Sequence, residues 1–394
     1  MSIHSHRVLG SLLALALVFT SACGAAQNTR SACGASEKTC APPPAKSSKV
    51  SVETIAKGLE NPWGMQFLPD GRLLVTERPG RMRIVSKDGK LSEPIAGVPE
   101  VAVIGQGGML DVLLAPDFDT TGTIYFSYGE PREADKNATS VARARLVLDD
   151  DSGHLENVKV IFRQEPAMKS KFHFGSRLAW APDGTLFITT GDRNHLRDEA
   201  QNPANTVGKM VRINPDGTIP DDNPKLEGWA PEVWSIGHRN IQGAAVHPET
   251  GQLFTIEHGP RGGDEVNLTQ KGKNYGWPVI TYGINYDGTT ITDLKEKEGL
   301  EQPIYYWVPS IATSGLAFYD GDLFPEWKGN AFVGGLGGER VERLVFDGDK
   351  VIAAEVLLDG RGDRIRDVRQ GPDGALWLLT DHKNGEVLRV FPAS

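Results

Sequence analysis

A pattern of apolar residues on either side of a tight turn recurs along the chain. In KFHFGSRLAWAPDGTLFITTGD, which spans residues 171–192, Leu178 and Trp180 precede a Pro-Asp-Gly turn, and Leu186, Phe187 and Ile188 follow it. Proline restricts φ and glycine permits positive φ, so a turn of this kind joins two antiparallel strands. The segment therefore predicts a β-hairpin.

The same hairpin pattern occurs six times. The other five copies are NPWGMQFLPDGRLLVTER, GGMLDVLLAPDFDTTGTIYFSYG, QGAAVHPETGQLFTIEHG, SGLAFYDGDLFPEWKGNAFVGG and IRDVRQGPDGALWLLTDH. The six turns are centred on Pro69, Pro116, Pro182, Pro248, Tyr319 and Pro372, which lie between 47 and 71 residues apart. Repeats of this kind are typical of β-propellers, in which each copy forms one four-stranded antiparallel blade. We therefore expect an all-β, six-bladed β-propeller.

Two further features follow from this fold class. The repeats are longer than the ~40–45 residues of a compact blade, so we expect long loops, and binding sites usually lie in such loops on one face of a rigid scaffold. Strand-like segments stand at both ends of the repeats, at residues 50–55 and 387–391. The topology predicts that they complete one shared blade and close the ring.

Composition agrees with this fold and narrows the function. The chain has 45 glycines and 25 prolines, which favour many short strands joined by turns. Its net charge of −9 argues against a general nucleic-acid binder, which needs a basic face. All three cysteines, Cys23, Cys33 and Cys40, precede residue 50, so the expected propeller contains neither a thiol nucleophile nor a thiolate metal site. Whether Cys33 and Cys40 pair stays open.

The first 23 residues have the pattern of an export signal. A short basic start is followed by an apolar run over residues 8–19, which is too short to span a membrane comfortably. Thr20-Ser21-Ala22-Cys23 resembles a lipobox, so a lipid anchor at Cys23 and ordinary cleavage near Ala22 or Ala26 remain alternatives. Residues 24–49 are expected to form a flexible tether, and residues 50–394 the propeller. The expected location is the periplasm, either free or as a membrane-anchored lipoprotein.

Polar residues stand at matching places in several repeats. Because the first strand of every blade lines the central channel, residues just before that strand meet at one mouth. The residues at this place are Gln106, His173, Arg239, Asn240, Arg364 and Arg366. A second set, at the end of the second strand, consists of Glu77, Asp192, His258 and Asp381. A buried polar network between blades is the structural alternative to a ligand site.

The residue types in these two sets indicate a chemistry. Three arginines in one channel mouth predict an anionic ligand with several carboxylates, because guanidinium groups bind carboxylates well. His173 beside Asp192 predicts a general base oriented by a carboxylate, with a hydrogen-bonded core histidine as the alternative. The segment EHGPRGGDEVNLTQKGKNYGWP, at residues 257–278, offers backbone carbonyls and carboxylates of the kind that Ca²⁺ binds, although an ordinary polar loop has the same composition.

Together these motifs resemble the soluble pyrroloquinoline quinone (PQQ) dependent sugar dehydrogenases of the glucose/sorbosone and aldose sugar dehydrogenase family. The resemblance covers roughly residues 52–392, and its most specific parts are GQGGMLDVLLAPDF, HFGSRLAWAPDGTLFITTGD, IGHRNIQG, EHGPRGGDEVN with NYGWP, and DRIRDVRQGPDG. It implies oxidation of an aldose at its anomeric carbon to a lactone, with PQQ and Ca²⁺ as cofactors. It also implies an electron acceptor, which the sequence does not identify.

The resemblance also implies roles for individual residues. His173 matches the general base, and Gln106, Asp192, Arg239, Asn240, Arg364 and Arg366 match positions that hold PQQ or the catalytic histidine. Gly259 and Pro260 match carbonyl ligands of the Ca²⁺ that polarises the quinone, whereas Glu265 and the main chain of Tyr275 match a second, structural Ca²⁺ site. One departure is Gly337, which stands where some members carry a lysine that contacts the cofactor; Arg340 nearby is not equivalent.

Two other functions remain alternatives. A metal-dependent lactonase on a six-bladed propeller would need acidic ligands in a channel mouth where this chain has arginines. A non-enzymatic cell-surface binding module would have no reason to place a histidine and three arginines in phase across blades.

Overall fold

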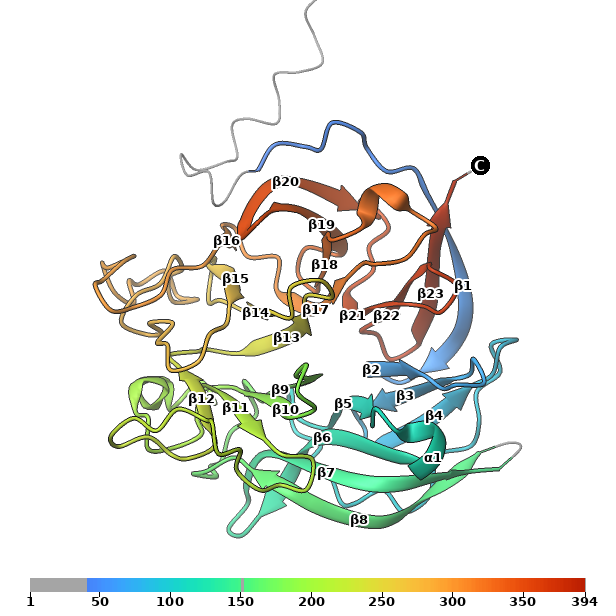
Figure 1. Cartoon of the computed structure of the whole chain (residues 1–394), viewed down its shortest axis with the longest axis horizontal. Helices are drawn as coiled ribbons and strands as arrows, with labels where there is room; N and C mark the ends of the chain where they lie inside the picture. Colours follow the sequence, from blue (N-terminus) through green and yellow to red (C-terminus); the bar gives the residue numbers. More distant parts are fainter. Residues whose placement is uncertain (1–40, 150–151, 394) are drawn as a thin grey trace, which may run out of the picture.

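The computed structural model describes residues 41–149 and 152–393 (Figure 1). In these ranges, six antiparallel sheets surround a central axis, which confirms the predicted six-bladed propeller. Five of the described sheets have four strands and one has three. In the three-stranded sheet, Leu91 makes an isolated bridge to Val85, so the following segment runs along the outer edge of that sheet.

The first five blades follow one another in sequence. Blade one consists of β2 (Pro62–Phe67), β3 (Leu73–Glu77) and β4 (Arg81–Val85). Blade two consists of β5 (Met109–Leu114), β6 (Thr123–Arg132), β7 (Lys136–Leu148) and β8 (Gly153–Arg163), with the short helix α1 (Phe118–Thr121) after β5. Blade three consists of β9 (Gly175–Trp180), β10 (Leu186–Thr190), β11 (Lys209–Ile213) and β12 (Val233–Ile236), with the 3₁₀ helix η2 (Arg197–Gln201).

Blade four consists of β13 (Ile241–Val246), β14 (Leu253–Glu257), β15 (Asp264–Leu268) and β16 (Tyr305–Trp307). Blade five consists of β17 (Thr313–Phe318), β18 (Ala331–Gly335), β19 (Arg340–Asp347) and β20 (Lys350–Leu357), with the 3₁₀ helix η3 (Pro325–Trp327). Each predicted hairpin is thus the pair of inner strands of one blade.

The sixth blade joins the two ends of the propeller. It contains β21 (Ile365–Gln370), β22 (Leu376–Thr380), β23 (Gly385–Pro392) and, at its outer edge, β1 (Val50–Leu59). β1 pairs antiparallel with β23, from Val50 opposite Pro392 to Leu59 opposite Gly385. The predicted closure by strands from both ends is confirmed, and Figure 1 shows the two strands side by side.

Residues 41–49, the last part of the expected tether, lie against the outside of the propeller. Ser48 donates hydrogen bonds from its backbone N and its Oγ to the carboxylate of Glu355, at 2.6 and 2.8 Å. The indole Nε1 of Trp327 donates to Ser48 Oγ at 2.8 Å, and the backbone N of Ala354 donates to the carbonyl of Pro42 at 2.9 Å. Contact with the folded body therefore begins before residue 50.

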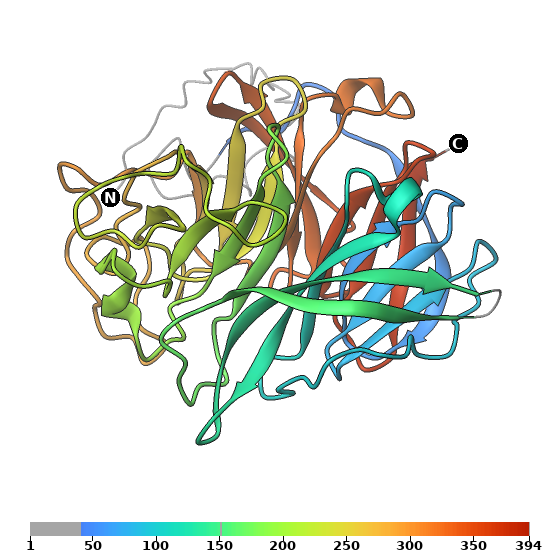
Figure 2. The same ribbon diagram turned by 60° about the horizontal axis from the view of Figure 1, so that its bottom comes forward.

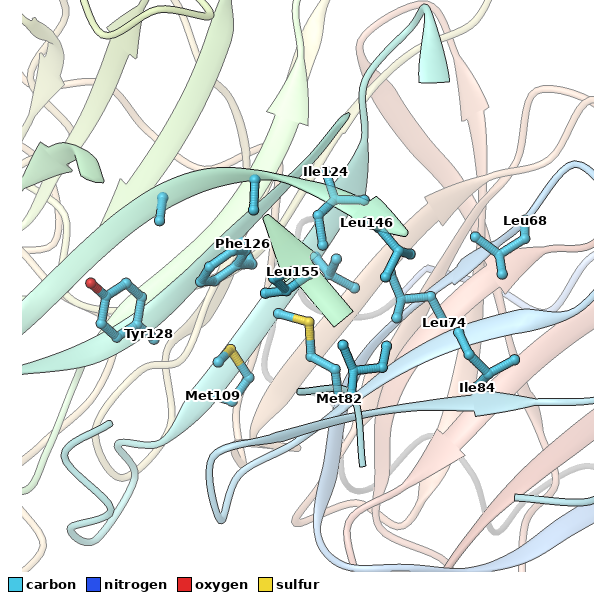
Figure 3. Packing of buried hydrophobic residues seen from close by; sticks show 14 residues of the cluster. Leu68, Leu74, Met82, Ile84, Met109, Ile124, Phe126, Tyr128, Leu146 and Leu155 are labelled. Carbon is cyan, nitrogen blue, oxygen red and sulfur yellow. The ribbon is translucent and has the colours of Figure 1, made fainter. Parts of the chain in front are cut away.

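Apolar residues between neighbouring blades hold the ring together. Figure 3 shows one such layer, in which Leu74 and Met82 of blade one pack against Met109, Phe126 and Leu146 of blade two. Comparable clusters join the other blades, so burial of apolar surface stabilises the ring as a whole. In the oblique view of Figure 2, the long hairpin of β6 and β7 projects beyond the neighbouring blades, at the end where the second strands finish.

Several predictions concern residues outside the described ranges. The export signal, the possible lipid anchor at Cys23 and the pairing of Cys33 with Cys40 all fall within residues 1–40. In the described ranges, no helix has the length and apolar character needed to cross a membrane.

Candidate active site

The polar residues predicted to meet, apart from Glu77, do so at one mouth of the central channel. His173 stands just before β9, and Asp192 lies two residues after the end of β10. The two side chains are joined by a 2.6 Å contact between His173 Nδ1 and Asp192 Oδ1, and both residues are buried. The other carboxylate oxygen of Asp192 accepts a 2.8 Å hydrogen bond from Trp277 Nε1. The predicted pair of an imidazole and an orienting carboxylate is therefore present.

The protonation state of this pair follows from its surroundings. Burial would raise the pKa of Asp192, but its hydrogen bond to His173 and the positive charge of Arg239 outweigh burial and lower it. Burial, with Arg239 as a second cause, lowers the pKa of His173, against the opposing effect of Asp192. At neutral pH Asp192 is thus an anion that can only accept, so the imidazole proton sits on Nδ1. The lone pair of His173 is left on Nε2, as a general base requires.

Two predicted residues hold the backbone around His173. Gln106 Oε1 accepts a hydrogen bond from the backbone N of His173 at 2.7 Å. Asn240 Oδ1 accepts one from the backbone N of Gly175 at 3.0 Å. His173 itself has a φ of 47°, in the left-handed region that non-glycine residues seldom adopt. Side chains from two neighbouring blades therefore fix an unusual backbone conformation at the base.

The three predicted arginines lie on two segments, Arg239 before β13 and Arg364 and Arg366 at the start of β21, and are held by different partners. Arg239 donates to the carbonyls of His258 and Gly259, the latter at 2.8 Å. Arg366 donates to Asp381 Oδ2 at 2.9 Å and to Gln242 Oε1 at 2.8 Å. Arg364 donates to the carbonyl of Leu336 at 3.0 Å, and its side chain is 41% exposed. The arginines are thus brought together, with Arg364 at the rim of the mouth.

Arg78 belongs to the same group, although the sequence reasoning did not select it. It directly follows β3, and it is close enough to Arg364, Arg366 and Asp381 for their charges to affect its pKa. Its position one residue after Glu77 in the repeat was the signal that could have identified it. Glu77 itself points elsewhere, because its carboxylate accepts from the backbone N of Glu60 and pairs with Arg81 at 2.9 Å.

Asp381 and His258 complete the polar lining. Burial would raise the pKa of Asp381, but the positive charges of Arg366 and Arg78 outweigh it and lower that pKa strongly. Burial, followed by the charge of Arg239, lowers the pKa of His258 well below its usual value, so His258 is neutral. Asp381 balances part of the positive charge and His258 adds none.

Several buried nitrogen atoms at this mouth have no hydrogen-bond partner within the described ranges. They are the Nε atoms of Arg78, Arg239 and Arg366 and the Nδ1 atom of His258. Buried polar groups are nearly always paired, and an unpaired one costs about 1–3 kcal/mol. Unpaired guanidinium atoms on three arginines at one mouth are what a site for an anion with several carboxylates requires.

The floor of the mouth is formed by an aromatic ring above a buried charge network. The guanidinium of Arg177 lies 4.3 Å from the ring centre of Trp63, and that of Arg366 lies 5.7 Å from it. Arg177 pairs with Asp111 and Asp367, each at 3.0 Å, and all three residues are buried in the channel. Arg177 therefore has a structural place below the site, and the channel is filled at this level.

The four predicted metal ligands line one small cavity of about 10 Å³. These residues are Gly259, Pro260, Glu265 and Tyr275. Glu257 and Glu265 both line it, and burial together with the charge of Glu257 raises the pKa of Glu265 to about 8. The nearby Asn267 Oδ1 is buried without a hydrogen-bond partner in the described part of the chain. Carboxylate, amide and carbonyl oxygens around such a space suit a hard cation.

Side chains alone do not form a metal centre in the described ranges, where no group of three or more His, Cys, Asp and Glu residues is arranged to hold an ion. Any ion here would depend on backbone carbonyls, as predicted for Gly259, Pro260 and Tyr275. The carbonyl of Gly259 already accepts from Arg239, which leaves one of its two lone pairs for a ligand.

Gly337 and Arg340, the departure from the family pattern, lie beside the mouth. Gly337 is exposed, and its backbone N donates to the carbonyl of Ile311 at 2.9 Å. Arg340 Nε donates to the carbonyl of Gly338 at 3.1 Å, so its guanidinium is turned toward its own loop.

The sequence of this chain is similar to those of known sugar dehydrogenases. Residues 59–389 match the family described as glucose/sorbosone dehydrogenase. The aldose sugar dehydrogenase YliI of Escherichia coli K12 is 46% identical over 353 residues, which cover 88% of this chain and 94% of that protein.

Solved structures agree with this match. The crystal structure of a glucose dehydrogenase has 50% sequence identity and a TM-score of 0.84, covering 87% of this chain and 100% of that one. The PQQ-bound aldose sugar dehydrogenase of Streptomyces coelicolor has 30% identity and a TM-score of 0.73, covering 88% and 99%.

Proposed function

The chain belongs to the glucose/sorbosone dehydrogenase family and is an oxidoreductase of the sugar dehydrogenase type, and we propose that it uses PQQ and Ca²⁺ to oxidise aldoses at the anomeric carbon. The observation that carries this proposal is the His173–Asp192 pair beside an arginine group with unpaired buried nitrogen atoms. The pair supplies a base, and the arginines supply an anion site next to it.

The residues of this mouth fit PQQ, which is a tricarboxylate. Arg78, Arg239 and Arg366 each hold a buried Nε without a partner in the described ranges, and Arg364 adds a charge at the rim. The buried ring of Trp63 lies next to the guanidinium groups of Arg177 and Arg366. PQQ, when bound, supplies a two-electron acceptor for hydride.

His173 carries out the proton transfer in the proposed reaction. Its Nε2 accepts the proton of the anomeric hydroxyl while C1 of the sugar loses a hydride, so the C1–O bond becomes a carbonyl and the product is a lactone. The sugar thereby loses two electrons and two hydrogens. Asp192 stabilises the imidazolium that forms and keeps the ring in the correct tautomer, as in other carboxylate-oriented histidine bases.

The cavity beside Arg239 fits a cation. Gly259, whose carbonyl contacts Arg239, lines this cavity together with Pro260, Glu265 and Tyr275, and these residues offer carbonyl and carboxylate oxygens. We propose that Ca²⁺ binds here, where it would compensate the buried carboxylates of Glu257 and Glu265 and act as a Lewis acid toward the cofactor.

Reconstitution tests the proposal. Purified apoprotein is mixed with PQQ and Ca²⁺, and reduction of an artificial dye is followed with a panel of aldoses. We expect dye reduction that depends on both cofactors. Hydrolysis of lactones without dye reduction would reject the dehydrogenase and favour a metal-dependent lactonase.

A variant at His173 tests the assigned base. We expect His173→Ala to bind PQQ like the unaltered protein, because no arginine is changed, and to lose most of its turnover. PQQ binding is measured by its absorbance change, separately from dye reduction. Turnover close to that of the unaltered protein would reject this role for His173.

The proposal extends to the location of the protein. The first 23 residues have the pattern of an export signal, so we propose that the enzyme works in the periplasm, free or anchored through Cys23. Fractionation of cells with labelled fatty acid distinguishes the two forms, and protein found in the cytoplasm would contradict both. The electrons would pass to an acceptor that the chain does not identify.

A further inference from the structure

A cleft of about 700 Å³ opens beside the candidate active site, between blades four and five. His258, Pro260 and Gly337 line its inner end, and Arg261, Ile284 and Tyr286 line it farther out. Its volume lies within the range of about 300–1,000 Å³ that is typical of small-molecule sites. His258 and Pro260 also line the small cavity of the predicted metal ligands, so the cleft adjoins the reaction centre.

The outer wall of the cleft is apolar and exposed. Tyr286 is 65% exposed, Val308 is 47% exposed and Ile284 is 37% exposed. Large apolar side chains that are exposed together mark a binding surface more often than a neutral one. A tyrosine ring also combines a flat apolar face with a hydroxyl group, which suits a ligand that is apolar on one face and polar at its edges.

The lining of the cleft carries positive charge and no negative charge. Its lining includes the guanidinium of Arg261 and no carboxylate. Within the described ranges, the Arg261 guanidinium makes no hydrogen bond or ion pair. Asp287 lies next to Tyr286 in sequence, but its carboxylate accepts hydrogen bonds from the backbone N and the Oγ1 of Thr289, at 2.9 and 2.6 Å. Arg261 is therefore available to a ligand that carries an anionic group.

The cleft is held in shape by backbone contacts. Arg261 and Ile284 form an isolated antiparallel bridge, with N-to-O distances of 3.0 and 3.2 Å. The turn that carries Tyr286 is closed by hydrogen bonds of 2.9 Å between Gly288 N and Asn285 O and between Asn285 N and Thr289 O. A preformed site loses less entropy when a ligand binds.

We propose that this cleft binds the second ring of an acidic disaccharide whose reducing-end sugar is oxidised at His173. The carboxylate of the second ring, a uronic acid, would pair with Arg261, and the C–H face of that ring would lie on Tyr286. This inference rests on the proposed function, because it names the substrate class of the same site.

Binding of a substrate analogue tests the cleft separately from turnover. The probes are the methyl β-glycosides of cellobiose and of cellobiouronic acid, which cannot be oxidised to a lactone because the anomeric oxygen is blocked. We expect the acidic probe to bind the full protein about tenfold more tightly than the neutral one, in the range of a charge-assisted contact in a partly exposed site. Calorimetry measures both affinities.

Variants identify the residues responsible. Arg261→Gln should remove the preference for the acidic probe, and Tyr286→Ala should weaken the binding of both probes. Arg145→Gln is the matched control. It removes an exposed arginine from β7, which belongs to blade two and not to the two blades that form the cleft, so it should leave the preference for the acidic probe unchanged. Equal affinity of the unaltered protein for the two probes, or an unchanged preference in Arg261→Gln with an unchanged melting temperature, would overturn the inference.

Turnover separates this inference from the proposed function. With PQQ and Ca²⁺ bound, we expect kcat/KM to be higher for cellobiouronic acid than for cellobiose, and this ratio to fall toward one in Arg261→Gln. Oxidation of glucose without any preference between the two disaccharides would reject the acidic subsite and leave the proposed function standing. Absence of oxidation of all three sugars, together with preferential binding of the acidic probe, would reject the proposed function and leave the cleft as an acidic-sugar binding site without the oxidation step.

Discussion

His173 can act as a base because its surroundings fix its charge, its tautomer and its backbone conformation. Burial and Arg239 lower its pKa, so the imidazole is neutral at pH 7, and Asp192 directs the proton to Nδ1. Gln106 holds the backbone of the same residue in a left-handed conformation. A change at any of these partners should therefore alter the reaction through His173.

Asp192→Asn tests the pairing. An amide can present its NH₂ to the imidazole and select the wrong tautomer, so we expect kcat/KM to fall by about 10²- to 10⁴-fold, the range that a general base contributes. Activity needs neutral His173 and is lost as the pH falls through its pKa, which burial and Arg239 hold below the ordinary value for histidine. Because Asp192 raises that pKa, the variant should lose activity at a lower pH than the unaltered enzyme does.

A pH profile of kcat/KM measures both effects. Asp322→Asn, which changes an exposed carboxylate on blade five, is the control and should match the unaltered enzyme. The role of Asp192 would be contradicted if the variant lost activity at the same acidic pH as the unaltered enzyme and reached the same maximal kcat/KM.

The arginine group should bind the anionic cofactor. We expect Arg366→Gln to raise the PQQ concentration needed for half-saturation by about 10- to 100-fold, since hydrogen bonds to charged groups contribute roughly 1.5–3 kcal/mol. Arg78→Gln should have a similar effect, which would identify a residue that the sequence motifs did not select. Titration with PQQ, followed by absorbance, measures this.

Arg361→Gln provides the comparison for these two variants. Arg361 precedes Arg364 by three residues but pairs with Asp363, so its removal should leave the titration unchanged. Equal half-saturation in all three variants would argue against a carboxylate clamp.

Glu265 allows a test of the cation cavity. A cation that binds only the folded state at 100 times its Kd stabilises that state by about 2.7 kcal/mol. We expect a chelator to lower the melting temperature of the unaltered protein and to have little effect on Glu265→Gln. Glu249→Gln, on an exposed turn, should respond like the unaltered protein. A chelator effect of the same size in Glu265→Gln would contradict binding at this carboxylate.

At the scale of elements, β1 is the strand that closes the ring. It pairs with β23, and its last residue, Leu59, is fully buried with Met65, Val75 and Val387. Blade one and blade six therefore share an apolar cluster to which the N-terminal strand contributes. The preceding residues 41–49 add hydrogen bonds to blade five, so the N-terminal segment of the described chain holds several blades in place.

Leu59→Ala should destabilise the folded protein by about 2–5 kcal/mol, because it leaves a cavity in this cluster. Ile352→Ala removes a similar side chain from the outer strand β20, where it is exposed, and should change stability by no more than about 0.5 kcal/mol. Urea unfolding of the two variants gives the comparison. Similar midpoints would show that β1 contributes little to closure.

At the scale of the whole molecule, the channel is closed by charged side chains from three blades. Asp111 comes from β5, Arg177 from β9, and Asp367 and Arg369 from β21. Arg369 pairs with Asp111 at 3.3 Å and with Asp367 at 3.1 Å, so two arginines and two aspartates alternate below Trp63. Such a network fixes how the inner strands are placed relative to one another under the active site.

Arg177→Met should destabilise the protein by about 3–5 kcal/mol, because it leaves two buried carboxylates with one cation. Combining it with Asp111→Asn leaves Asp367 paired with Arg369, so no unpaired charge remains, and should recover much of the stability. Thermal unfolding measures both variants. If the double variant is less stable than Arg177→Met alone, the loss comes from packing rather than from unpaired charge.

The sequence by itself determined the fold class and most of the site. Turn residues and alternating strands depend on near neighbours in the chain, so six hairpins can be found without a structure. The same repeat places Gln106, His173, Asp192 and the three arginines in phase, because equal positions in equal blades meet around one axis. Closure by β1 and β23 followed from the same topology.

Only the tertiary structure decided which of the phased residues face the centre. Glu77 and Asp381 occupy matching places, yet Glu77 pairs with Arg81 at the side of blade one, and Asp381 joins Arg366 and Arg78 in the mouth. The docking of residues 41–49, the charge network below Trp63 and the cleft at Arg261 depend on contacts between segments far apart in the chain. Local patterns carry no information on such contacts, because packing between blades sets their distances.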